Sequence, residues 1–206
     1  MSDADHRRWV WENRYADHVR VLNEWIDSRN SATRWMPYVS PVHSAQARVL
    51  SVLRAPAASS DWQVGFGDTE ERRGFLSLEN DDDAAEESLR LVTEVAGLDA
   101  TVVTPWNAYP YYLGHDRAPD TGQLSEGAKH LKLLLREVMV DVHHVVLQGA
   151  EARRCWAVLR SRDARFCNGY RVWTTSGPTS RAPGRTTAEQ LAEREQTWRD
   201  VAAALR

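Results

Sequence analysis

A short segment around Asn107 carries the residues best suited to chemistry. Asn107 lies among four aromatic residues within seven positions, Trp106, Tyr109, Tyr111 and Tyr112. Its side chain offers one acceptor and two donors, which can pair with the edge of a nucleobase. Aromatic rings in a loop are costly to leave in water, so they must cover something. The segment therefore favours a pocket for a flat, polar ligand; in the alternative interpretation, the rings close the core and Asn107 caps the next turn.

Such a pocket needs a scaffold, and the periodicity of apolar residues predicts one. Strands are expected over 47–53, 101–105, 145–148 and 170–174, and helices over the first thirty residues, 83–96, 124–138, directly after Gly149 and at the C-terminus. Pro105 and Pro110 are expected to stop the second strand, because proline has no N–H to donate to a sheet. Strands that alternate with helices predict an α/β fold, a three-layer α/β/α sandwich around a four-stranded parallel sheet.

The predicted sheet also predicts where a ligand binds. In open parallel sheets, ligands lie beyond the carboxyl ends of the strands. Here those ends carry the segments 54–60, 105–115, 149–151 and 175–185. The aromatic segment around Asn107 and the loop rich in Gly, Pro and Arg after the last strand should therefore converge.

Length and composition fit one soluble domain over 1–206, with residues 1–40 as a helical extension packed on it. Hydrophobic residues make up 42% of the chain and charged residues 27%, which is ordinary for a globular protein. The sequence contains no apolar run long enough to predict a membrane span, and the N-terminus lacks the apolar core of a signal peptide. Two cysteines are too few for a zinc or iron–sulfur site. We expect a cytoplasmic monomer without metal or cofactor.

The net charge of −3 gives no nucleic-acid signature, but its distribution along the chain is uneven. Residues 151–185 contain eight arginines and two acidic residues, whereas 66–100 are rich in Asp and Glu. The basic part could contact phosphates. Equally, it could be a solvated face balanced by the acidic half.

Four pieces in this order resemble the uracil-DNA glycosylase superfamily, over about residues 48–185. Residues 52–57, Val-Leu-Arg-Ala-Pro-Ala, resemble its first motif, a strand that ends in a Gly-x-x-Pro-Gly or Gly-x-Ala-Pro-Ala turn. Residues 74–77, Gly-Phe-Leu-Ser, stand where that family has a base-stacking aromatic ring, and Pro-Trp-Asn at 105–107 matches the strand end whose Asn reads the base. The apolar strand and glycine turn at 145–150, followed by Cys155 and Trp156, complete the resemblance.

The resemblance implies a DNA glycosylase that extrudes uracil or another modified base and hydrolyses its N-glycosidic bond. The residues implied for catalysis are Arg54, Ala55, Pro56 and Glu79; those for base binding are Phe75, Trp106, Asn107 and Tyr109; those for DNA contacts are Ser176, Gly177, Pro178, Thr179, Ser180 and Arg181. Phe75 would stack on the base, Asn107 would bind its edge, and the 176–181 loop would meet phosphates. Glu79 or Asp61 would handle the attacking water, unless Glu79 only begins an acidic helix.

Two departures concern the chemistry. The first motif has Arg54 and Ala55 where many members have an acid that positions water. The second motif, usually His-Pro-Ser-Pro, corresponds to residues 177–181 and lacks the histidine that stabilises the departing base. Weak activity on ordinary uracil DNA is therefore expected, and Arg54 or Arg181 could replace the missing charge.

The departures leave other functions open. One is a glycosylase fold that binds DNA, a nucleobase or a nucleotide without cleaving it. Another is an unrelated nucleotide-processing enzyme, which is disfavoured because no Gly-x-Gly-x-x-Gly or phosphate loop is present. DNA is the expected partner, in single- or double-stranded form.

Overall fold

A computed structural model describes residues 3–57, 74–114, 117–179 and 186–206. The helices are α1 (Asp3–Glu12), α2 (Asp17–Asp27), α3 (Asp83–Arg90), α4 (Thr121–Glu137), α5 (Ala150–Arg162), α6 (Ala164–Cys167) and α7 (Thr187–Leu205). The strands are β1 (Tyr38–Val39), β2 (Val49–Leu53), β3 (Phe75–Leu76), β4 (Val103–Asn107), β5 (His144–Gln148) and β6 (Arg171–Thr175). A π-helical turn, Leu91–Val95, extends α3, and a short 3₁₀-helix, Ala100–Val102, precedes β4.

The central sheet has four parallel strands in the order β4-β2-β5-β6, which confirms the predicted fold class. The chain moves from β2 outward to β4 and then crosses back to β5 on the other side of β2. The direction of the connections therefore reverses between β2 and β5. Such a reversal marks the place where open α/β sheets form a crevice for ligands, at the carboxyl ends of the strands.

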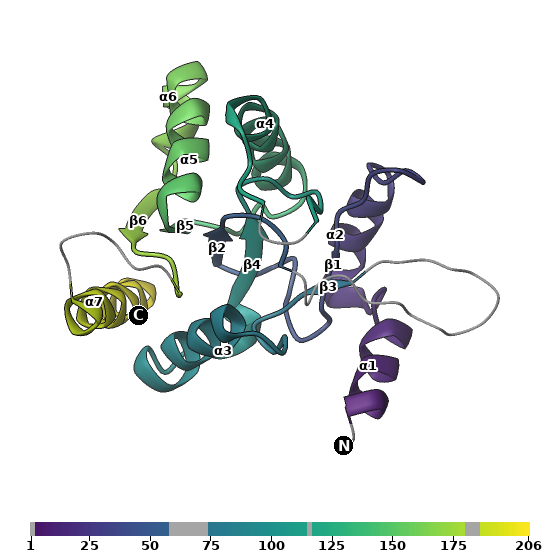
Figure 1. Ribbon diagram of the computed structural model, residues 1–206, viewed down its shortest axis with the longest axis horizontal. Helices are drawn as coiled ribbons and strands as arrows, with labels where there is room; N and C mark the ends of the chain where they lie inside the picture. The colour runs from purple at the N-terminus through teal and green to yellow at the C-terminus, as the bar shows by residue number, and fades with distance from the viewer. Residues whose placement is uncertain (1–2, 58–73, 115–116, 180–185) are drawn as a thin grey trace.

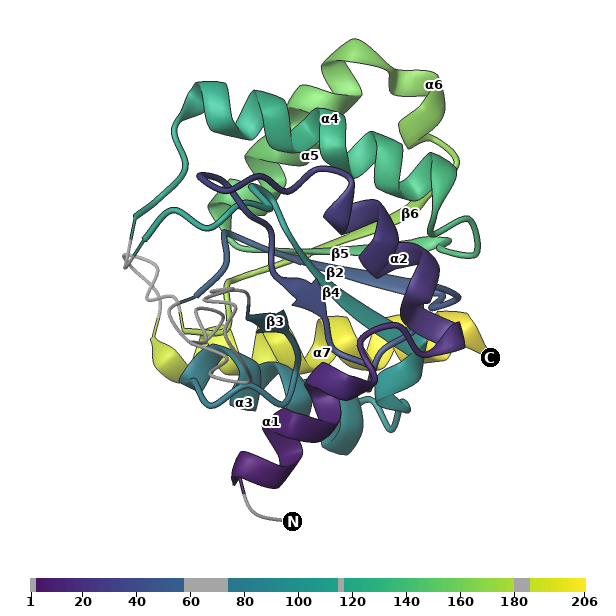
Figure 2. The same cartoon turned by 90° about the vertical axis from the view of Figure 1, so that its right-hand side faces the viewer.

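Helices cover both faces of this sheet, as Figure 1 shows with α4 and α5 above it and α3 and α7 below it. On the first face, Leu50, Val52 and Leu147 pack in one buried cluster with residues of α2, α4 and α5. On the second face, Val49 and Val146 pack with the π-helical turn and α7. Figure 2 shows the same three layers from the side, with α7 running along the underside of the sheet. Side chains alternate between the two faces along each strand, which gives each layer its own apolar stripe.

The expected N-terminal helix is two helices, because the chain turns between Asn13 and Ala16. Ala16 has an extended backbone, with ψ at 146°. Asn23, buried in α2, donates a hydrogen bond to the carbonyl oxygen of Arg14 at 2.7 Å and so holds the turn. The apolar spacing runs on through the turn, which is why periodicity alone predicts one continuous helix.

The second strand of the central sheet lies two residues further along than expected, at 103–107 rather than 101–105. Pro105 is inside β4 and does not stop it. The reason is that β4 is an edge strand, where a residue without an N–H can face away from its single partner strand. This shift makes Asn107 the last residue of the strand.

A second, two-stranded sheet was not expected. Tyr38 and Val39 of β1 pair in parallel with Phe75 and Leu76 of β3. Strands this short carry no readable alternation, so the sequence gives no signal for them. In the described part of the chain, no helix is long and apolar enough to cross a membrane.

Candidate functional site

The last residues of the four central strands form one row across the sheet. Asn107 of β4 pairs with Leu53 of β2, and Gln148 of β5 pairs with Thr175 of β6. Leu53 and Gln148 directly follow the last pair of β2 and β5. Residues in register in a parallel sheet project to the same face. This row therefore projects to the face that α3 and α7 cover, since the preceding row belongs to the opposite cluster.

Polar atoms in and beside this row are buried without hydrogen-bond partners. Asn107, Gln148 and Thr175 are at most 2% exposed. In the structure as described, Asn107 Nδ2, Gln148 Oε1, Thr175 Oγ1 and the neighbouring Ser176 Oγ have no partner. An unpaired buried polar group costs roughly 1–3 kcal/mol, so groups of this kind call for an explanation. A ligand or ordered water that pairs with them is the simplest one.

Backbone hydrogen bonds hold the loops beyond the row close together. The amides of Ala108 and Tyr109 donate to the carbonyl oxygens of Leu53 and Arg54, at 2.7 and 3.2 Å. On the other side, the amide of Gly149 donates to the carbonyl oxygen of Thr175 at 3.0 Å. These bonds extend the pairing past the strand ends, so the side chains of the row are held on a rigid edge.

Two glycines let other elements approach the site closely. A Cβ atom on Gly127 of α4 would lie 1.8 Å from the carbonyl oxygen of Ala108, so only glycine lets α4 pack against the residue after Asn107. Gly149 has a φ of 93°, which other residues rarely adopt, and lies beside Gly177. The turn from β5 into α5 and the loop after β6 therefore meet at two residues without side chains.

Arginines anchor the loop after β6 from two helices. Arg153 of α5 donates to the carbonyl oxygen of Thr175 at 3.1 Å. Arg194 of α7 is 6% exposed, donates to the carbonyl oxygen of Gly177 at 3.2 Å, and lies 3.4 Å from a carboxylate oxygen of Glu87. This loop is the one that resembles the second glycosylase motif, and its backbone is fixed by charge-assisted bonds.

The structure places the residues of the first motif at the same edge. Arg54, Ala55 and Pro56 follow β2 directly, and the Arg54 side chain is exposed while Pro56 is buried. Arg54 thus brings a positive charge to the end of the strand that lies between Asn107 and Gln148. Ser176, Gly177, Pro178 and Thr179 follow β6 at the same edge. Ser180 and Arg181, also expected to contact DNA, and Asp61, the alternative to Glu79 for handling water, lie outside the described residues.

Phe75 does not share a pocket with Asn107. Its ring is fully buried and packs against Trp11 and Tyr38, with ring centres 6.3 and 5.7 Å apart. It belongs to the cluster on the face opposite to the one that Asn107 faces. The stacking role expected for Phe75 therefore has no support in this arrangement, because neither face of the ring is open to a base.

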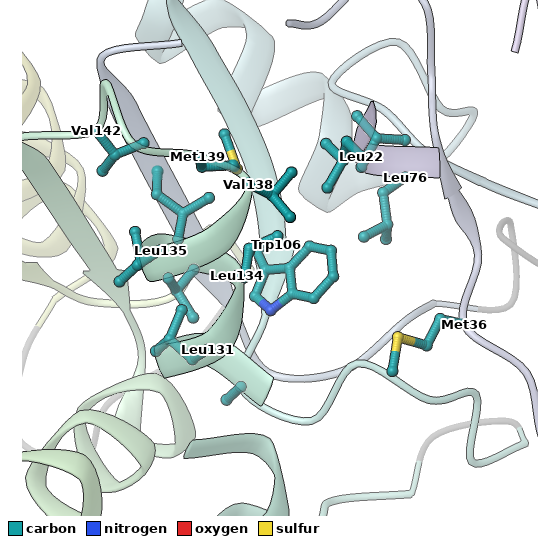
Figure 3. Close-up of a cluster of buried hydrophobic side chains, with 14 of the residues drawn as sticks. Leu22, Met36, Leu76, Trp106, Leu131, Leu134, Leu135, Val138, Met139 and Val142 are labelled. Carbon is teal, nitrogen blue, oxygen red and sulfur yellow. The ribbon is translucent and has the colours of Figure 1, made fainter. Parts of the chain in front are cut away.

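Trp106 and Tyr109 also serve the core and not a base pocket. Figure 3 shows the Trp106 ring beside Leu134 of α4 and Val138, which directly follows α4. The rings of Trp106 and Trp25 also contact each other edge-on. Tyr109 is 5% exposed, and its hydroxyl accepts a hydrogen bond from Arg34 at 3.1 Å. The interpretation of these rings as core closure is therefore the correct one. Asn107 differs because strand alternation turns it to the other face.

Glu79 lies away from the carboxyl edge. Its neighbour Leu78 donates its amide to His43 Nε2, and the other ring nitrogen of His43 is 3.0 Å from the carbonyl oxygen of Val103, the first residue of β4. Glu79 therefore lies near the amino end of this strand, where its carboxylate is 3.8 Å from His6 Nε2. The structure does not bring it to the water-handling position expected from the sequence.

Several site residues were missed from the sequence alone. Gln148 and Thr175 enter the site because they are in register with Leu53 and Asn107, and register is not readable from separate strands. Arg153 and Arg194 contact the site from helices. One signal was available for Gln148: a polar residue that ends an apolar strand and precedes a glycine turn.

The described ranges contain no group of three His, Cys, Asp or Glu side chains that could hold a metal ion. Cys155 and Cys167 are both buried and free, and burial raises the pKa of Cys155 to about 12. What the site offers is neutral amide and hydroxyl groups beside arginines.

No known protein-family model matches the chain, and no curated protein matches it in sequence.

Proposed function

We propose that this chain is a DNA glycosylase of the uracil-DNA glycosylase type, which binds an extruded base at the carboxyl edge of its sheet and hydrolyses the N-glycosidic bond. The observation that supports this most is the unpaired Nδ2 of Asn107, buried in a row with the unpaired Oε1 of Gln148. One group donates and the other accepts, which matches the alternating carbonyl and N–H groups along the edge of a pyrimidine such as uracil.

Specific groups in the site have separate roles in this proposal. Asn107 donates to a carbonyl oxygen of the base, and Gln148 accepts from its N–H. Negative charge develops on the base as the bond to the sugar breaks, and the exposed Arg54 supplies the opposite charge at the same edge. In the anchored loop of Ser176 to Thr179, the exposed Thr179 presents its backbone and hydroxyl group to the DNA strand.

A second candidate function is binding of a base without cleavage. It is favoured by the position of Glu79 beside His6, and by Gly177 in the place of the motif histidine. Among the described residues, Glu79 lies away from the carboxyl edge, and Arg54 stands in for the motif histidine as the charge that stabilises the leaving group, so the chemical step loses much of its support. A missing donor of this kind lowers rates by about 10²–10³ in other enzymes.

The test is incubation with single- and double-stranded oligonucleotides that carry uracil, hypoxanthine, xanthine or bulky modified cytosines, followed by alkali cleavage at abasic sites. We expect slow excision of uracil and faster excision of a base that leaves more easily. Asn107→Ala should abolish both binding and excision, whereas the control Asn13→Ala, at a partly exposed position directly after α1, should change neither.

The outcomes separate the two functions. Binding that depends on Asn107, without cleavage of any substrate, supports the second function. Excision of uracil at the rate of an ordinary repair enzyme would contradict the weight given to the missing histidine. Excision or binding that survives Asn107→Ala would remove the carboxyl edge from the proposal.

A further inference from the structure

A cavity lies on the outer flank of the sheet, between α5 and the edge strand β6. Its volume is about 590 Å³, within the range of about 300–1,000 Å³ typical of small-molecule sites. Leu147 and Val172 line it from the sheet, and Trp156 lines it from α5. These residues belong to the face of α2, α4 and α5, or pack against it, whereas the row of Asn107 projects to the opposite face. The cavity therefore lies on the other face of the sheet from the Asn107 row, although Arg153 lines the cavity and also bonds to Thr175 at the carboxyl edge.

Two arginines on one side of α5 give this cavity its charge. Arg153 and Arg160 both line it and are both exposed on their helix. They are seven residues apart, which is two helical turns or about 10 Å along the axis. Across the part of the chain that the structure describes, the side chain of Arg160 forms no ion pair or hydrogen bond, and the side chain of Arg153 bonds to one backbone oxygen, that of Thr175.

The nearby acidic group does not neutralise this charge. Asp163, at the end of α5, forms a 2.8 Å ion pair with Lys132 of α4. The Cys167 thiol, which lines the cavity beside Arg160, has a raised pKa because it is buried, so it remains neutral at physiological pH. An occupant of the cavity therefore meets two positive charges and no opposing carboxylate among its lining residues.

The rest of the lining is aromatic, apolar and amide. Tyr170 is partly exposed and lines the cavity, and its ring contacts Trp156 edge-on at 6.0 Å and Phe166 at 5.2 Å. Asn168, exposed at the same end as Arg160 and Cys167, adds an amide. Guanidinium groups bind phosphate in a planar, two-point geometry, and aromatic rings stack on flat ligands.

We propose that this cavity is a binding site for a nucleoside monophosphate. The phosphate binds at Arg160 beside Asn168, and the base lies over the apolar floor of Leu147 and Val172 against Tyr170, with Arg153 at its far end. A bare phosphate would leave the apolar floor uncovered, and an uncharged nucleoside would leave Arg160 without a partner. The occupant therefore needs both parts.

Calorimetric titration of the full chain with deoxyadenosine monophosphate, deoxyadenosine and inorganic phosphate tests this assignment. We expect saturable binding of the monophosphate and affinities lower by at least about tenfold for the two fragments. Arg160→Gln should weaken the binding of the monophosphate by about tenfold, because it removes a charge-assisted bond. Arg154→Gln changes a neighbouring exposed arginine that does not line the cavity, and should leave the affinity within about twofold.

Asn107→Ala distinguishes this cavity from the carboxyl-edge site and should not change the affinity for the monophosphate. No saturable binding by the wild-type chain would overturn the proposal. So would binding that is lost in Asn107→Ala and kept in Arg160→Gln, or lost equally in Arg154→Gln and Arg160→Gln. Thermal unfolding of each variant identifies any loss that comes from misfolding. If Arg160→Gln proves unstable, Asn168→Ala provides the same comparison at the other side of the phosphate.

Discussion

The two ends of the central sheet differ in whether their buried polar side chains have hydrogen-bond partners. At the amino end, His43 is fully buried and both ring nitrogens are bonded: Nδ1 to the carbonyl oxygens of Ala100 and Val103 at 3.2 and 3.0 Å, Nε2 to the amide of Leu78 at 3.1 Å. Thr104 donates to the carbonyl oxygen of Ser44 at 2.7 Å. At the carboxyl end, Asn107, Gln148 and Thr175 are as deeply buried and each keeps an unpaired atom.

The difference distinguishes polar residues whose hydrogen bonds are complete from polar residues that keep an unpaired atom. Both ends carry the desolvation cost of burying polar atoms, but the amino end recovers it through internal hydrogen bonds. The carboxyl end does not, although it belongs to the same rigid sheet. Buried polar groups left without partners are typical of functional sites, and this supports the proposed ligand site at the carboxyl end.

The largest effect is expected where the polar network is complete. His43→Ala removes a fully buried ring, leaves a cavity, and leaves the amide of Leu78 without a hydrogen-bond acceptor. We expect a loss of about 4 kcal/mol in the free energy of unfolding, measured by urea denaturation at pH 7. A loss below about 1 kcal/mol would mean that the amino-end network is not structural and would break the comparison.

A somewhat smaller effect should follow from pH alone. Burial lowers the pKa of His43 to about 4, although its bonds to Ala100 and Val103 act in the other direction. The unfolded chain binds a proton on this ring near pH 6.5 and the folded chain near pH 4. Between these pH values the unfolded state holds more protons than the folded state. The contribution of His43 to the free energy of unfolding is therefore complete above pH 6.5, and it falls by roughly 3 kcal/mol in total as the pH falls towards 4.

The measurement for this pH dependence is urea denaturation between pH 7 and pH 4 for the wild type and for His43→Gln, whose carboxamide does not titrate. The difference between the two pH profiles isolates His43 from other titrating groups, including His130, whose pKa burial also lowers. Parallel profiles would show that His43 is not held neutral by the fold.

The layers of this fold were predictable because they depend on local patterns. The strand that begins at His144 and the helix that begins directly after Gly149 follow from an apolar run and a glycine turn. The placement of Pro105 inside a strand was not predictable. It depends on β4 being an edge strand, and strand order is a property of the whole sheet.

The site was predictable only in part for the same reason. Asn107 at the carboxyl edge follows from the order of strands and loops. Whether Phe75 is open or covered depends on α1 and β1, which bring Trp11 and Tyr38 onto its ring from distant positions in the sequence. The unpaired state of Gln148 depends on how β5 is placed between β2 and β6. Its amide nitrogen donates to Ser51 of β2 at 2.7 Å, and its oxygen has no partner in the described chain.

The smallest effect on stability is expected at Asn107 itself. Asn107→Leu replaces a buried carboxamide whose nitrogen has no partner with an apolar group of similar shape. Replacing an unpaired polar group in this way is close to neutral or stabilising, so we expect the free energy of unfolding to change by less than about 1 kcal/mol, or to rise. Binding to base-modified DNA should nevertheless be lost, because leucine cannot donate to the base. Urea denaturation and DNA titration of one protein sample measure both quantities. A strongly destabilised variant would show that Asn107 has an internal partner, and the contrast between the two ends of the sheet would then disappear.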